Sequence, residues 1–208
     1  MNFIEDFAET IKNIQGFRPD LFAGATETEL KAAEEKMNIT LPEDFKNFYR
    51  AFNGQNEYAN ALFDTFFLCS LKQILYFWDA FKFNEEDFLQ IPAEAEPGIK
   101  NVWGCALWVP FAATADGHCL CLDFEPAEGG NAGQVITFWY NSPERELVAP
   151  SFKDFIVDYV ASIKNGTYVY TQEVYDDIAL GMIARKDGKP MFGAKMSRIN
   201  CKNSCKIF

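Results

Sequence analysis

Residues 106–124 read ALWVPFAATADGHCLCLDF, and this stretch decides the fold class. Two apolar runs, 106–111 and 119–124, flank the turn-forming tripeptide Ala115-Asp116-Gly117. A third apolar run, QVITFWY at 134–140, follows a connection that is rich in glycine. Short apolar runs separated by turn residues predict three successive antiparallel strands, which together form a β-meander.

Helical signals precede the meander. The apolar residues within 2–15 fall on one stripe of a helix. Thr26 and Glu29 have the spacing of a capping box, which predicts the start of a second helix. Pro42 suits the first turn of a third helix. We expect that helix to end at Asn53-Gly54, because this pair of residues tolerates the left-handed conformation.

Other segments give signals of different kinds. Residues 70–82 have helical periodicity, whereas 85–100 is acidic, contains two prolines and is expected to be partly irregular. Ser151 is expected to cap a helix after the meander. Residues 167–184 predict a short β-prone stretch and then a helix around 172–184, and the 24 residues from 185 onward predict a poorly ordered tail or a late hairpin. Because regular βαβ alternation is absent, this order of elements predicts an α+β fold with one sheet.

The composition predicts a chain that folds around a conventional core. The chain has 208 residues, of which 49% are hydrophobic and 21 are phenylalanine. A chain of this length fits one large domain, or one domain with a short appendage. Neither disulfides nor structural metals are needed for its stability, because a chain of this size buries roughly 70% of its unfolded surface.

The charge is unevenly distributed along the chain. The net charge is -11, yet residues 185–208 carry seven basic side chains and one acid, a net +6. The remaining 184 residues therefore carry 12 basic and 29 acidic side chains, a net -17. So acidic a domain repels nucleic acid and attracts cationic surfaces. We expect a protein partner with a cationic surface, and no nucleic-acid partner.

The sequence also predicts where the protein acts. Residues 1–14 mix acids with apolar side chains and lack the basic leader and the continuous apolar run of a secretory signal. No run approaches the roughly 18 apolar residues of a membrane span. We therefore expect a cytoplasmic protein without a membrane partner, in which the six cysteines stay reduced.

Four motifs, taken in order, resemble a known family. The first spans Ile39–Phe45 and closes with Asn53-Gly54; the second is Trp108-Val109-Pro110-Phe111-Ala112 with Asp116-Gly117. The third is Cys121-Leu122-Asp123-Phe124 with Gly133-Gln134-Val135-Ile136, and the fourth is Ala149-Pro150-Ser151-Phe152 with Phe155. In order and spacing they resemble the SUKH superfamily, which includes bacterial immunity proteins and fungal cell-wall-assembly regulators. The resemblance covers roughly residues 25 to 160.

The resemblance implies an α+β fold with a single mixed, largely antiparallel sheet braced by helices. We expect a SUKH-like domain over residues 1–166 with an extra N-terminal helix, and a C-terminal extension over 167–208 with a basic tail. The motif residues themselves are expected to have structural roles, since they suit turns, helix ends and core positions. They are Leu41, Pro42, Asn53, Gly54, Trp108, Pro110, Asp116, Gly117, Asp123, Ser151 and Phe152.

Catalytic and cofactor sites find little support in the residues. The one histidine, His118, follows a turn, where we expect it to be exposed and without a catalytic role. Asp116, His118, Asp123 and Glu125 are the residues from which a metal site could be assembled, but they do not converge cleanly, because neighbouring strand residues point to opposite faces. The glycine-rich stretch 128–134 precedes a strand, whereas a phosphate-binding loop precedes a helix. We expect no catalytic residues, no metal and no cofactor.

For bacterial members, the resemblance implies that the protein binds and neutralises a toxin. We expect a non-catalytic immunity protein whose acidic surface occludes a cationic toxin domain, with a nuclease or a deaminase favoured by charge. The acidic segment 85–96 is the hypothetical contact region. Its contact residues are Glu85, Glu86, Asp87, Glu94 and Glu96. Two alternatives stay open: a regulatory scaffold of the cell-wall-assembly-regulator kind, and a metal-assisted enzyme.

Overall fold

A five-stranded antiparallel sheet forms the centre of the fold. The structure, a computed structural model, describes residues 2–175 and 178–192. The strand order of the sheet is β3-β5-β6-β7-β9. These strands are β3 (Phe67–Leu68), β5 (Trp108–Ala113), β6 (Cys119–Asp123), β7 (Gln134–Phe138) and β9 (Leu147–Ala149). Strands β5, β6 and β7 pair in sequence, which confirms the predicted meander.

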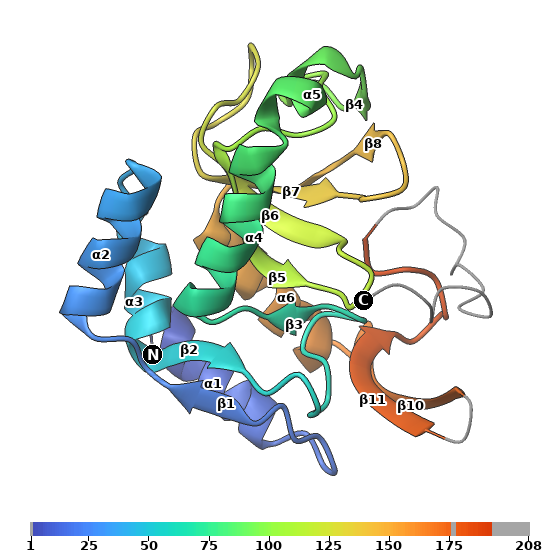
Figure 1. The fold of residues 1–208 in the computed structure, drawn as a ribbon. Coiled ribbons are helices and arrows are strands. Elements are labelled where there is room, and N and C mark those ends of the chain that lie inside the picture. Colours follow the sequence, from blue (N-terminus) through green and yellow to red (C-terminus); the bar gives the residue numbers. More distant parts are fainter. Residues whose placement is uncertain (1, 176–177, 193–208) are drawn as a thin grey trace.

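Helices cover both faces of this sheet. Helix α4 (Leu71–Phe83) lies in front of the sheet and α6 (Phe152–Lys164) lies behind it (Figure 1). Every residue of β5, β6 and β7 is buried as a result. Strands buried on both faces have continuous apolar sequences rather than alternating ones. This is why the meander was visible in the sequence as three mainly apolar runs, in which Asp123, Gln134 and Thr137 are buried polar exceptions.

Local capping signals set the starts of the helices. Asn2 caps α1 (Phe3–Lys12) and Thr26 caps α2 (Glu27–Met37), each in a complete capping box. Ser70 and Ser151 cap α4 and α6 through their hydroxyl groups. A side-chain oxygen at each of these positions accepts a bond from an otherwise unpaired amide of the first turn. The predicted caps Thr26 and Ser151 are confirmed.

The predicted end of the third helix is wrong. Helix α3 (Glu43–Ala51) stops before Asn53-Gly54, which lies in strand β2 (Phe52–Gln55), paired with β1 (Leu21–Ala23). Gly54 has φ +90°, and a Cβ there would lie 2.4 Å from the backbone nitrogen of Ser70. The side chain of Asn53 accepts a hydrogen bond of 2.8 Å from the amide of Leu71. The pair joins β2 to the start of α4 instead of capping a helix.

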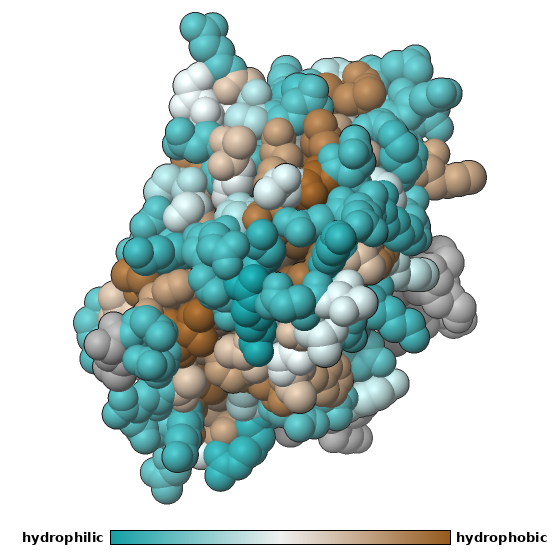
Figure 2. All heavy atoms as spheres, turned by 90° about the vertical axis from the view of Figure 1, so that its left-hand side faces the viewer, coloured by the Kyte–Doolittle hydropathy of each residue, from teal (hydrophilic) through white to brown (hydrophobic). Residues whose placement is uncertain are grey.

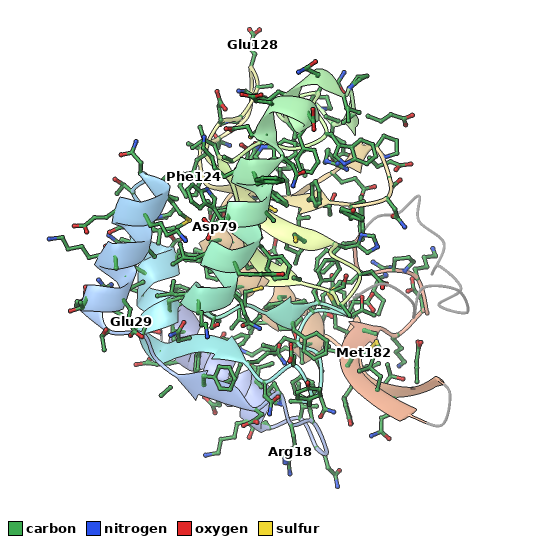
Figure 3. The ribbon with its side chains drawn as sticks, in the orientation of Figure 1. Arg18, Glu29, Asp79, Phe124, Glu128 and Met182 are labelled. Carbon is green, nitrogen blue, oxygen red and sulfur yellow. The ribbon has the colours of Figure 1, made fainter. Side chains whose placement is uncertain are left out.

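The helix predicted around 172–184 is also wrong. Strands β10 (Tyr168–Tyr175) and β11 (Ile178–Arg185) form an antiparallel hairpin. The amide of Ala61 donates to Gly181 O at 2.8 Å, and Met182 is buried where β11 meets the body of the molecule (Figure 3). Partners more than 100 residues away in sequence therefore hold this segment extended. The prediction for 193–208 lies outside the described residues.

The acidic segment 85–100 is partly irregular, as expected. It contains the short helix α5 (Glu85–Gln90) and strand β4 (Glu94–Ala95), which pairs in parallel with β8 (Glu144–Arg145). Helices and largely antiparallel strands together confirm the predicted α+β class. None of the helices in the described ranges is long and apolar enough to cross a membrane.

Candidate partner-binding surface

The motif residues lie mainly in the interior or at turns. Leu41, Trp108 and Phe152 are at most 1% exposed. Phe152 packs edge-on against Phe45 and Phe111, with ring centroids 4.9 Å and 5.3 Å away. Pro110 is buried, Pro42 precedes α3, and Asp116-Gly117 forms the turn between β5 and β6. These positions suit structural roles in the core and at turns, although Asp116 itself is exposed.

Asp123 is buried in a hydrogen-bond network, not in a metal site. It is 0% exposed and accepts bonds of 2.9 Å from the amide of Glu125 and from the side-chain nitrogen of Gln134. Burial raises the pKa of its carboxyl, and these hydrogen bonds partly oppose that rise. Asp116 lies in the turn before β6, at the opposite end of that strand from Asp123. Because a strand rises about 3.3 Å per residue, its length keeps the two carboxylates apart. Among the residues that the structure describes, no group of three His, Cys, Asp or Glu is placed to hold a metal ion.

His118 is buried, contrary to the expectation of an exposed turn histidine. It is 8% exposed, its Nδ1 accepts a hydrogen bond of 3.1 Å from the amide of Tyr140, and its ring meets Trp139 edge-on at 5.1 Å. Burial lowers the pKa of the imidazole. The side chain therefore anchors the end of β7 against the β5–β6 turn. Only tertiary packing decides this, because the residue next to a turn has no burial signal of its own in the sequence.

Arg145 is a buried cation that the sequence did not single out. It is 0% exposed, and its guanidinium donates to the backbone carbonyls of Trp103, Ser142 and Glu144 at 2.5 to 3.1 Å. It also lies 4.7 Å from the ring centroid of Phe138. Burial lowers its pKa to about 10. Arg145 thereby fixes β8, and with it β4 and the segment that follows α5, to the core.

Next to this anchor lies a surface that we call the α5 rim. It consists of Phe83, Glu86, Asp87, Leu89, Ile91 and Glu94. Phe83 is 88% exposed, and Leu89 and Ile91 are exposed by more than 40%. Figure 1 shows α5 and β4 together at one end of the molecule, beyond α4. The rim therefore combines apolar side chains with carboxylates on one short stretch of chain.

The predicted contact residues divide into two kinds. Glu86, Asp87 and Glu94 are exposed, and no described cation lies within ion-pair distance of them. Glu85 is half-buried, pairs with Lys82 at 2.7 Å and accepts a hydrogen bond of 3.0 Å from the amide of Ala106. Glu96 is exposed but accepts a bond of 2.9 Å from the amide of Leu147. Glu85 and Glu96 thus hold the backbone in place, which the sequence pattern could not reveal.

A second acidic surface, on α2, differs in its charge balance. Glu27 pairs with Arg50 at 2.5 Å, Glu34 with Lys46 at 3.5 Å and Glu35 with Lys31 at 3.7 Å. Hydrogen bonds from Arg50 lower the pKa of Glu27. The side of the molecule that carries α2 is mostly hydrophilic, with smaller hydrophobic patches between (Figure 2). Three of the four carboxylates of α2 are therefore paired with cations of the chain, and the fourth, Glu29, accepts capping bonds from Thr26, whereas Glu86, Asp87 and Glu94 of the α5 rim have no described cation partner.

Comparisons with known proteins bear on this arrangement. A family model described as the SMI1/KNR4 family (SUKH-1) matches residues 24–158. The protein "Cell wall biosynthesis/cell cycle regulator smi1" of Schizosaccharomyces pombe is 29% identical over 92 residues. That match covers 44% of this chain and 18% of the yeast protein, so the chain corresponds to a small part of this relative. The matched range contains the whole α5 rim, and it ends before the β10–β11 hairpin.

Proposed function

Because the chain belongs to the SMI1/KNR4 family (SUKH-1), we propose that it is a non-catalytic module that binds a cationic partner protein through the α5 rim. One observation carries the proposal: the exposed carboxylates of Glu86, Asp87 and Glu94 lack described cationic partners and share a short stretch of chain with an almost fully exposed phenylalanine, Phe83. A central apolar anchor with charged residues around it is the usual anatomy of a binding hot spot.

The proposed partner is the cationic domain of a cognate toxin, which makes the chain an immunity protein that acts by occlusion. A nuclease or a deaminase is favoured, because enzymes that act on nucleic acid present cationic grooves. The -11 net charge of the chain supports attraction to such a groove. The proposed site of action is the cytoplasm.

A regulatory scaffold is the second candidate function. It is favoured by the similarity to the Schizosaccharomyces pombe protein, whose name describes a cell-wall and cell-cycle regulator. In this case the α5 rim binds an endogenous regulatory protein instead of a toxin. Both candidates use the same surface and differ in the identity of the partner.

The test is capture of the partner from native lysate at low and high salt, with identification by mass spectrometry. The Glu86→Lys/Asp87→Lys protein is compared with a matched control, Glu9→Lys/Glu57→Lys, which changes two other exposed acids. We expect a basic protein that is lost at high salt and lost with the rim variant alone. A toxin encoded by a neighbouring gene identifies an immunity protein, and an endogenous regulator identifies a scaffold. Equal capture by the two variants contradicts the role of the rim.

A further inference from the structure

A groove of about 310 Å³ lies between the edge of the central sheet and helix α6. Residues 146–149 form one side of it, and Phe155, Asp158 and Tyr159 of α6 contribute to the other. Tyr168 of β10 and Phe192 complete the apolar lining. The groove is separate from the exposed apolar residues of the α5 rim, although Glu96 also lines it.

The side formed by residues 146–149 exposes the edge of a strand. Among the described strands, β9 is the last in the sheet and pairs only with β7. Side chains of successive strand residues point to opposite faces of a sheet. Four consecutive residues can therefore line one groove only if the groove runs along the strand, beside its backbone. Such an edge presents backbone groups that can pair with an added strand.

Strand β4 pairs in parallel with β8, the short strand just before β9 in the chain, and then stops. The amide of Glu94 donates to Pro143 O at 2.8 Å, and the amide of Glu96 donates to Arg145 O at 2.9 Å. Pro97 follows, and proline has no amide hydrogen with which to continue the ladder. The carboxylate of Glu96 instead accepts the next bond, from the amide of Leu147 at 2.9 Å. The groove begins where the pairing by β4 ends.

The chemistry of the lining selects for a basic occupant. Among its described residues, the groove contains the carboxylates of Glu96, Glu146 and Asp158 and no lysine or arginine. Its aromatic residues offer apolar surface to one side chain of an occupant, and the ring of Phe155 packs against that of Phe192 at 6.1 Å. A strand with alternating apolar and cationic residues complements both properties at once.

We propose that this groove binds an extended, basic segment of the partner protein, which adds as a strand to β9. The inference rests on the proposed function, because it assigns the groove to the same partner that contacts the α5 rim. Backbone hydrogen bonds supply pairing at the groups of β9 other than the Leu147 amide, which already donates to Glu96. Apolar side chains of the segment enter the groove beside Phe155, and its cationic side chains meet Asp158 and Glu96. The rim and the groove then hold two parts of one partner.

The probe is a fluorescent eight-residue peptide of alternating lysine and valine, titrated into the full chain and followed by anisotropy. A twin peptide with N-methyl groups on alternate amides keeps the side chains but cannot pair as a strand. We expect the twin to bind at least about tenfold more weakly, because main-chain pairing carries affinity in strand addition. Equal binding of both peptides overturns the proposal.

Two variants test the position of the site. Asp158→Lys is expected to weaken peptide binding about tenfold, because it places a like charge beside the cationic peptide. Glu128→Lys is the matched control, since Glu128 is exposed at a loop tip far from the hairpin in Figure 3, and it is expected to leave binding unchanged. Equal losses in both variants point to general attraction and overturn the proposal.

A further variant and the partner capture separate the remaining outcomes. Replacement of Lys195, Arg198, Lys202 and Lys206 by Gln leaves peptide binding unchanged if a partner fills the groove. A gain of about tenfold identifies the chain's own basic segment as the occupant and overturns the proposal. If peptide binding fails while partner capture still depends on Glu86 and Asp87, the groove assignment falls and the proposed function stands.

Discussion

The α2 surface and the α5 rim are both acidic, but they handle their charge in opposite ways. On α2, Glu27 and Glu35 face cations of the same chain at 2.5 Å and 3.7 Å. On the rim, Glu86 and Asp87 have no described cation in reach and lie near Phe83, which is 88% exposed. A carboxylate that is paired within its own chain has little left to offer a partner. Charge balance, not charge count, is therefore what separates the α5 rim from the α2 surface.

The largest expected effect concerns Arg145, which fixes the segment after α5 to the core. Arg145→Met removes the guanidinium from three partly buried backbone carbonyls and leaves them without this donor. We expect a loss of about 3–5 kcal/mol in the free energy of unfolding, measured by urea denaturation, because each of the three carbonyls loses a hydrogen bond to a charged group and each such bond contributes about 1.5–3 kcal/mol. Arg50→Met on the α2 side is the control, and its exposed ion pairs predict a much smaller loss. Similar losses in the two variants contradict the distinct role of Arg145.

The helix starts and the β-meander could be predicted from the sequence, because both depend on local interactions or on burial of whole strands. The caps Thr26 and Ser151 act on amides within three residues, and the meander is mainly apolar because both its faces are buried. The β10–β11 hairpin could not be predicted in the same way. Its β11 strand is held by bonds to Ala61 and by burial of Met182, which are tertiary contacts.

The candidate site was predictable only in part. An irregular acidic segment pointed to residues 85–96, but the sequence does not show which of its carboxylates hold the backbone. Glu85 bonds to the amide of Ala106, and Glu96 bonds to the amide of Leu147. Arg145 gave no signal, because an arginine between two glutamates resembles an exposed residue of an edge strand. The attachment of the segment after α5 to the core depends on the hydrogen bond from Arg145 to the carbonyl of Trp103. No local sequence pattern encodes this contact.

Phe83 is the most exposed of the apolar side chains in the α5 rim. Phe83→Ser is expected to weaken binding of the captured partner by at least about 2 kcal/mol, roughly 30-fold, because exposed aromatic anchors dominate binding energy. The free energy of unfolding should change by less than about 0.5 kcal/mol, since the side chain is outside the core. Titration calorimetry and urea denaturation measure the two quantities.

Tyr58→Ser supplies the matched control for that experiment. Tyr58 is 90% exposed, as Phe83 nearly is, but it lies in the turn after β2 and away from the acidic segment. We expect its loss to change neither stability nor partner affinity. If both variants weaken binding equally, exposed aromatic residues in general are responsible and the rim has no special role.

A smaller effect places the pH dependence of stability in the core. Burial lowers the pKa of His118 in the folded state, so the unfolded chain binds the proton first as the pH falls. Stability should therefore decrease below the unfolded pKa of about 6.5, with a slope of at most about 1.4 kcal/mol per pH unit. His118→Asn, which keeps an acceptor for the amide of Tyr140, should remove this part of the slope in urea denaturation between pH 7.5 and 5.

Asp123 has the opposite sign and is separable from His118. Burial raises the pKa of its carboxyl, so its contribution to stability declines as the pH rises through the interval above the ordinary value of 3.8. A difference between wild type and His118→Asn that grows as the pH falls from 6.5 identifies the histidine. An unchanged slope in the variant contradicts the assignment and moves the pH dependence to other groups.

The smallest expected effects come from removing one carboxylate from each of the two surfaces. Glu27→Gln removes the ion pair with Arg50, whereas Glu94→Gln removes a carboxylate with no described cationic partner. We expect Glu27→Gln to lower stability slightly at low salt and not at 1 M salt, because salt screens exposed ion pairs. Glu94→Gln should leave stability unchanged but slow association with the partner about two- to threefold, since single rim charges act mainly on the rate of encounter. If Glu27→Gln slows association equally, long-range attraction by the whole acidic domain governs the rate of encounter. The difference between paired and unpaired carboxylates then does not decide where the partner binds.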